Sequence, residues 1–136
     1  MKQQLKKGKY FIGDPSYLFD ASWTKVLNET DFFNNEPSKI NGKIVVAGST
    51  AYGDGVYCDN HGREYGVDSG MIGILPISLR TIDTQYTVDE INKSVIMHIV
   101  DFKEDFTAEC EKGKFKFGDI EINTTGDDED EEEDFS

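Results

Sequence analysis

The fold is decided by Ala51-Tyr52-Gly53-Asp54-Gly55-Val56-Tyr57 together with Val67-Asp68-Ser69-Gly70-Met71-Ile72-Gly73. These two segments contain the densest run of glycine, aspartate and tyrosine in the chain. Glycine tolerates backbone angles that other residues avoid, and aspartate side chains bond to backbone N–H groups in turns. We therefore expect tight turns that carry exposed carboxylates, with strands leading into and out of them.

The sequence around these turns predicts strands. Asn41-Gly42 lies between apolar residues and indicates a two-residue hairpin turn, because both residues accept a positive φ. Ile44-Val45-Val46-Ala47 is continuous and mostly β-branched, which predicts a strand buried on both faces. We expect further strands at residues 10–12, 56–58, 64–67, 71–75 and 95–102, and an alternating meander over residues 106–124.

Helical signals are fewer. Asp20 or Ser22 can cap a helix over residues 22–33, with Trp23, Val26 and Leu27 on one face. Residues 87–90 have the spacing of a capping box and predict one or two helical turns. The lysine-rich residues 1–9 are interpreted as a solvated N-terminal arm.

These patterns define the fold class and the domains. They predict an α+β protein: a mostly antiparallel, curved sheet or small barrel with one main helix packed on it. We expect residues 1–126 to form a single globular domain and residues 127–136 to form a disordered acidic tail, because eight consecutive acids repel one another and bury no apolar surface.

Charge is the strongest functional signal. The chain has 14 basic and 27 acidic residues, a net charge of −13. Eight acids lie at residues 127–134, and the remaining 14 basic and 19 acidic residues still leave −5. Such a surface disfavours direct nucleic acid binding and favours basic partners or cations. The interaction residues that we predict are Asp127, Asp128, Glu129, Asp130, Glu131, Glu132, Glu133, Asp134 and Phe135.

The compartment follows from what the sequence lacks. No apolar run approaches the ~18–20 residues of a membrane span, and no apolar stretch follows the N-terminal lysines. We therefore expect a cytoplasmic protein without membrane contact, in which Cys58 and Cys110 are reduced thiols.

A ligand or cation site is one alternative. Asp14, Asp54 and Asp68 each lie in a turn with glycine, and three converging carboxylates could hold a divalent cation such as Mg²⁺ or Ca²⁺ and activate water. Tyr52, Tyr57 and Ser69 complete this candidate site, and Asp59 and His61 could join it. The competing interpretation is that these aspartates only stabilise turns, since no defined metal-binding spacing is present and no cofactor is required.

Nucleophilic catalysis has little support. The candidate nucleophiles are Ser16, Ser69, Cys58 and Cys110, and the only histidines are His61 and His98. Residues 66–70 do not form the Gly-x-Ser-x-Gly elbow, and His98 is expected to be packed within a strand. The sequence therefore favours a non-enzymatic role.

Two resemblances bear on function. Gly-Asp-Pro-Ser-Tyr (13–17), Ala-Tyr-Gly-Asp-Gly-Val-Tyr (51–57) and Val-Asp-Ser-Gly-Met-Ile-Gly (67–73) resemble a group of small bacterial and phage proteins without an established activity, which often have Cys in place of Ser16. The acidic run followed by Phe135 resembles the C-terminal tails of single-stranded-DNA-binding proteins, although Ser136 follows here.

Three hypotheses result. The first is an acidic interaction protein, with phage origin as one alternative, that engages or inhibits a basic or nucleic-acid-binding host protein, including by nucleic acid mimicry. The second is the carboxylate-lined cation or small-ligand site, with hydrolase activity. The third is a single-stranded nucleic acid binder regulated by its acidic tail.

Overall fold

The computed structural model describes residues 2–19, 23–79 and 97–125. The predicted tail at residues 127–136 and the predicted helical turns at residues 87–90 lie outside these ranges and stay predictions. The described elements are β1 (Lys2–Leu5), β2 (Gly8–Gly13), α1 (Ser16–Phe19), α2 (Trp23–Glu29), β3 (Ser38–Ile40), β4 (Lys43–Ser49), β5 (Gly55–Cys58), β6 (Glu64–Val67), β7 (Met71–Pro76), the 3₁₀ turn η2 (Ile77–Leu79), β8 (Met97–Phe102), β9 (Phe106–Glu111), β10 (Lys114–Phe117) and β11 (Ile120–Asn123).

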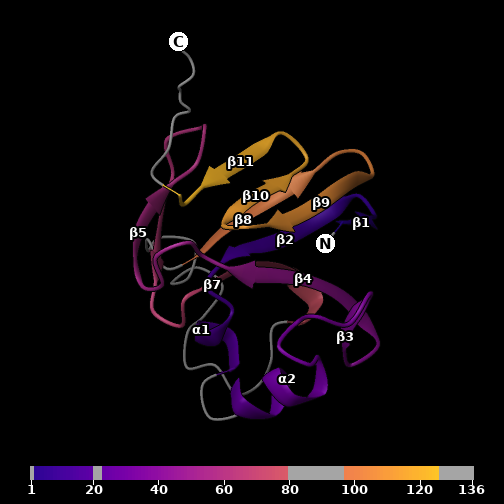
Figure 1. The fold of residues 1–136 in the computed structure, drawn as a ribbon. Coiled ribbons are helices and arrows are strands. Elements are labelled where there is room, and N and C mark those ends of the chain that lie inside the picture. The colour runs from indigo at the N-terminus through magenta and orange to yellow at the C-terminus, as the bar shows by residue number, and fades with distance from the viewer. Residues whose placement is uncertain (1, 20–22, 80–96, 126–136) are drawn as a thin grey trace.

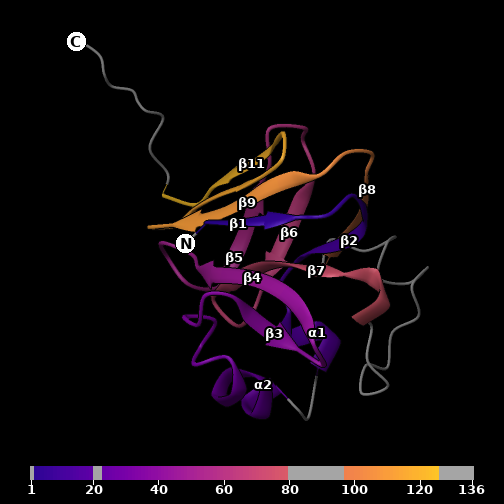
Figure 2. The same ribbon diagram turned by 90° about the vertical axis from the view of Figure 1, so that its right-hand side faces the viewer.

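The strands form three antiparallel sheets. A five-stranded sheet has the order β3-β4-β7-β2-β8, a four-stranded sheet has the order β1-β9-β10-β11, and β5 and β6 form a hairpin. The helices lie on one side of the five-stranded sheet and the four-stranded sheet lies on the other (Figures 1 and 2). Helices on one face of an antiparallel sheet are typical of an α+β fold, so this class is confirmed.

The five-stranded sheet is buried on both faces because apolar residues occupy both sides of its central strands. In β2, Tyr10 and Ile12 face the four-stranded sheet, while Phe11 belongs to the core beneath the helices. In β4, Val46 belongs to the first core, and Val45 and Ala47 belong to the second. This confirms the prediction of a strand buried on both faces at residues 44–47.

Two predicted local features are also confirmed. β3 and β4 pair through a two-residue turn in which Asn41 and Gly42 have φ values of 51° and 79°. Strands β9, β10 and β11 alternate buried and exposed residues, as a sheet with one wet face requires.

Other predictions need correction. The sheets do not close into a barrel, because β1 and β9 continue away from β2 and β8 into a separate sheet. The lysine-rich N-terminus is not a solvated arm, since β1 pairs with β9. The meander predicted over residues 106–124 is confirmed as β9, β10 and β11, whereas β8 pairs with β2 in the five-stranded sheet.

The predicted main helix over residues 22–33 is confirmed only in part. The described residues contain two short helices, and α2 lies within the predicted range but ends at Glu29 rather than at Phe33. Asp31, Phe32 and Phe33 have φ values of 52°, 56° and 64°, so the chain turns with left-handed geometry there. The Thr30 hydroxyl supports this turn by donating to Val26 O at 2.9 Å and accepting from Phe33 N at 3.0 Å. The turn buries Phe33 under the sheet, which explains why the helix cannot continue.

No helix in the described ranges has the length and apolar character needed to cross a bilayer.

Candidate functional site

The buried carboxylate of Asp14 connects two of the motifs that the sequence singled out. Its Oδ1 accepts hydrogen bonds from Ser16 N (2.9 Å), Ser16 Oγ (2.8 Å) and Ser69 Oγ (2.7 Å). Its Oδ2 accepts from Asp68 N (2.6 Å) and Ser69 N (2.7 Å). Five donors satisfy the acceptor sites of a carboxylate, so Asp14 fastens the turn after β2 to the turn before β7.

The third motif joins them through its glycines. Gly53 O accepts from Thr50 Oγ1 at 2.5 Å and from Tyr57 Oη at 3.0 Å, and Thr50 N donates to Gly70 O at 2.9 Å. A Cβ on Gly70 would lie 3.6 Å from Gly53 Cα, so the two loops are in contact. We call residues 50–55 and 68–70 the paired loops. Three motifs far apart in sequence thus form one hydrogen-bonded unit.

The paired loops and the start of β5 present an exposed surface. Tyr52 and Val56 are 71% and 62% exposed, which is high for large apolar side chains. Asp54 and Asp68 are exposed beside them, while Tyr57 is half-buried. The surface therefore combines apolar and negatively charged groups on a backbone that is held by hydrogen bonds from Thr50 and Tyr57 and to Asp14.

The end of β11 is attached to this surface. Thr124, 2% exposed, donates from its backbone N to Gly113 O at 2.9 Å and from Oγ1 to the same oxygen at 2.5 Å. Its Oγ1 accepts from Ala51 N at 2.9 Å. The last described residue, Thr125, therefore lies next to the paired loops.

A crevice of about 380 Å³ lies between the end of β4 and the β9–β10 turn, beside Ala51. Cys110 lines it, and burial raises the pKa of its thiol to about 12. This thiol is thus protonated at neutral pH and lacks the thiolate form that nucleophilic attack requires. The remaining lining residues are Gly48, Ser49, Thr50, Ala51, Glu111, Lys112 and Gly113.

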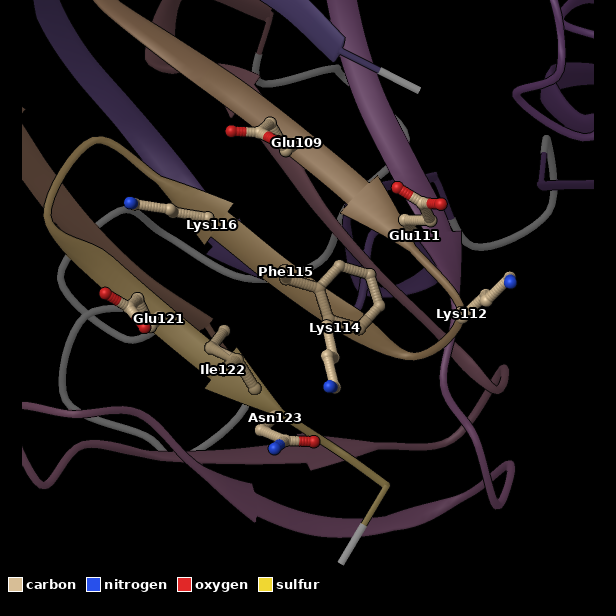
Figure 3. Close-up of a pocket in the computed structure, with 9 residues that line it drawn as sticks. All are labelled: Glu109, Glu111, Lys112, Lys114, Phe115, Lys116, Glu121, Ile122 and Asn123. Carbon is tan, nitrogen blue, oxygen red and sulfur yellow. The ribbon is translucent and has the colours of Figure 1, made fainter. Parts of the chain in front are cut away.

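A second hollow of about 520 Å³ covers the outer face of the four-stranded sheet (Figure 3). Across the strands Lys116 lies opposite both Glu109 and Glu121, so positive and negative side chains alternate on this face. Phe115 and Ile122 line the hollow but are only 2% and 1% exposed. This face therefore offers balanced charge and no exposed ring for base stacking.

Asp59 closes the β5–β6 turn. The buried carboxylate accepts from Tyr65 Oη (2.7 Å), His61 N (2.8 Å), Arg63 N (2.9 Å) and Arg63 Nη1 (3.2 Å). Burial acts to raise the pKa of Asp59, but the hydrogen bonds from Tyr65, Arg63 and His61 outweigh it and lower this pKa. Burial and the neighbouring Asp59 raise the pKa of Tyr65.

The histidines have structural contacts. His61 Nε2 lies 3.4 Å from Asp119 Oδ2 at the surface. His98 Nε2 contacts Glu64 O at 2.6 Å, and the ring packs edge-on against Tyr65. The prediction that His98 is packed within a strand is confirmed. Among the described residues, neither histidine forms a hydrogen bond with Ser69.

The structure brings the predicted ligand residues together only in part. Asp14, Ser69 and the backbone of Asp68 meet, and Tyr52, Asp54 and Tyr57 belong to the adjoining loop. The three carboxylates do not converge: Asp14 is buried, Asp54 and Asp68 are exposed, and the described residues contain no group of three His, Cys, Asp or Glu side chains able to hold a metal ion. The predicted interaction residues 127–135 lie outside the described ranges.

Sequence reasoning missed the roles of Thr124 and Gly113. Both contact Ala51, which is more than sixty positions earlier in the chain, so no local pattern indicates them. Comparison with protein-family models, with curated proteins and with solved structures gave no significant match.

Proposed function

We propose that the protein is an acidic, non-enzymatic interaction protein that engages a basic surface of another protein, including one whose own ligand is a nucleic acid. Its net charge of −13 attracts positively charged surfaces and accelerates encounter with them. The partner is a protein rather than a nucleic acid, because phosphates are repelled by the same charge.

The observation that carries the proposal is the hydrogen bond from Ala51 N to Thr124 Oγ1 at 2.9 Å. It attaches the end of the described domain to loops that expose Asp54 and Asp68. The sequence then continues within a few residues into eight consecutive acids. The exposed carboxylates of the paired loops therefore lie near Thr124 and Thr125, the residues that directly precede the acidic run in the sequence.

The run of eight consecutive acids supports mimicry of a nucleic acid strand, because both are polymers with one negative charge on every repeating unit.

Three of the four candidate nucleophiles support a binding role rather than catalysis. The hydroxyls of Ser16 and Ser69 both donate to Asp14 and so help to fasten the loops on which the exposed surface rests. The raised pKa of Cys110 keeps its thiol protonated at neutral pH.

The test is affinity capture from a bacterial lysate with the immobilised full-length protein. We expect capture of basic, nucleic-acid-binding proteins, their release by high salt, and their displacement by a single-stranded oligonucleotide. A variant with residues 127–134 changed to the corresponding amides keeps the chain length and should lose most of this capture. Capture that resists both salt and the amide substitutions would contradict the proposal.

A charge-matched pair of variants locates the surface. The double variant Asp54→Asn with Asp68→Asn removes two negative charges from the paired loops. The double variant Glu29→Gln with Glu36→Gln removes two negative charges from the end of α2 and the loop that precedes β3. We expect only the first pair to reduce capture. Equal effects would mean that net charge alone, and not this surface, attracts the partner.

A further inference from the structure

We propose that the outer face of the four-stranded sheet is the contact surface of a homodimer in which two copies of this chain stack face to face. The partner is therefore a second copy of the protein, and opposite charges on facing strands hold the two copies together. This inference goes beyond the proposed function, since it concerns a different surface from the paired loops and a different partner.

On the outer face of this sheet, the charged residues of each strand all have the same sign. Buried and exposed residues alternate along β9, β10 and β11, so every second side chain points outward. Across the strand order β1-β9-β10-β11 the sign of the outward charges is positive, negative, positive and negative. The residues are Lys2 on β1, Glu109 and Glu111 on β9, Lys114 and Lys116 on β10, and Glu121 on β11.

The strand register aligns four of these charges in one row across the sheet. Lys2 lies opposite Glu109, which in turn lies opposite Lys116. On its other side Lys116 lies opposite Glu121, and Figure 3 shows it between the two glutamates. In the described part of the chain all ion pairs lie elsewhere, so these side chains are available to charges on a partner.

An alternating order over four strands is self-complementary under a twofold rotation. An axis parallel to the strands and midway between β9 and β10 reverses the strand order in the second copy, and stacked sheets commonly keep their strands aligned in this way. Each β9 then faces β10 of the other copy, and each β1 faces β11. Lys116 thereby faces Glu109 of the second copy. Lys2 faces Glu121 at both edges, so the same patch serves both copies, as a twofold interface requires.

This face lacks the excess negative charge of the whole chain. Its six charged residues are three lysines and three glutamates, whereas the chain has a net charge of −13. A second copy can therefore approach this face without local repulsion between like charges. The hollow of about 520 Å³ on the same face leaves room for the long lysine and glutamate side chains of the facing copy.

The predicted dimer is weak. Four strands at a spacing of ~4.8 Å span only about 15–20 Å, so the contact falls below the ~1,200 Å² of standard interfaces. In sedimentation equilibrium experiments on the full-length protein, we therefore expect a monomer–dimer equilibrium in which the dimer appears as the protein concentration is raised. A protein that stays monomeric up to its solubility limit would overturn the inference.

Two charge reversals test whether β9 faces β10 of the second copy. Glu109→Lys places a lysine opposite Lys116 of the second copy, and Lys116→Glu places a glutamate opposite Glu109. Each variant alone should associate at least about tenfold more weakly than the wild type, because like charges then face each other twice in the dimer. An equimolar mixture should recover association, since the lysines of one variant face the glutamates of the other.

Matched controls come from helix α2, where Lys25 and Glu29 are exposed. Lys25→Glu and Glu29→Lys make the same changes in net charge, yet they should associate within about twofold of the wild type, alone or mixed, because they lie far from the contact and are screened. The double variant Glu109→Lys with Lys116→Glu controls for folding. It keeps an opposite pair across β9 and β10 and restores opposite charges between the copies, so it should associate as the wild type does.

The outcomes separate this inference from the proposed function. Failure of the mixture to recover association, or equal weakening by the α2 reversals, would refute the charge-complementary face. A wild-type protein that stays monomeric but captures basic lysate proteins would overturn the dimer and leave the proposed function standing. A dimer that shows the expected response to the reversals but captures no such protein would support the dimer, while the proposed function would fail.

Discussion

At the scale of single residues, Asp14 is the group on which the exposed surface depends. A buried carboxylate is costly unless hydrogen bonds compensate it, and here five donors do so without a cation among them. The sequence placed Asp14 in a turn correctly. It could not reveal the burial, because Asp68 and Ser69 lie 54 and 55 positions away.

Asp14→Asn should strongly destabilise the fold. One carboxylate oxygen becomes an amide nitrogen that donates, so it faces N–H or O–H donors and leaves buried groups unpaired. We expect a loss of about 3 kcal/mol in the free energy of unfolding, measured by chemical denaturation. Asp54→Asn, on an exposed side chain, should change it by less than ~0.5 kcal/mol. A loss for Asp14→Asn as small as that of the control would show that the five bonds do not hold the loops.

Asp59 makes stability depend on acid pH. Its pKa is lowered in the folded protein, so its hydrogen bonds contribute fully above the unfolded pKa of ~3.9 and are lost as the pH falls through the lower folded value. Tyr65→Phe removes one of these bonds and should flatten the decline in unfolding free energy between neutral and acid pH. Tyr57→Phe loses a bond to a neutral carbonyl and should leave the slope unchanged. Parallel acid profiles for wild type and Tyr65→Phe would contradict this.

At the scale of elements, the hairpins and buried strands follow from local sequence, and the ends of elements do not. Asn41-Gly42 and the β-branched run before Ala47 are sufficient to predict β3 and β4. Strand β1 lies at the edge of a sheet, where it pairs with β9, and three of its four residues are polar. Its sequence therefore has no apolar pattern from which a strand could be predicted. Helix α2 ends where Phe33 must enter the core, and only the tertiary structure determines that point.

The β9–β10 turn should be more sensitive to substitution of its glycine, Gly113, than the β3–β4 turn is to substitution of Gly42. Gly113 and Gly42 have φ values of 80° and 79°, but a Cβ on Gly113 would lie 2.9 Å from Ala51 Cβ and Thr124 Oγ1, whereas nothing lies within 4 Å of one on Gly42. Gly42→Ala should cost about 1–2 kcal/mol from backbone strain alone. Gly113→Ala should cost about 1–3 kcal/mol more, measured by denaturation, because it also overpacks. Equal losses in the free energy of unfolding for the two variants would mean that Gly113 is not closely packed against Ala51 and Thr124.

At the scale of the whole molecule, charge is distributed unevenly. Lysines and glutamates alternate on the outer face of the four-stranded sheet, whereas residues 127–134 alone account for eight of the negative charges. The sequence is sufficient to predict this excess. It does not predict that Thr124, three positions before the acidic run, is bonded to Ala51 in the paired loops, because these two residues are 73 positions apart.

Attraction of basic partners by the protein's negative charge is tested most directly by the dissociation constant of the full-length protein for an oligolysine peptide, measured over a range of sodium chloride concentrations. We expect a steep loss of affinity with salt, because screening weakens attraction between exposed charges. We also expect a shallower salt dependence when the acids at residues 127–134 are changed to amides. An affinity that is independent of salt, or a salt dependence that the amide substitutions leave unchanged, would rule out the proposed electrostatic interaction.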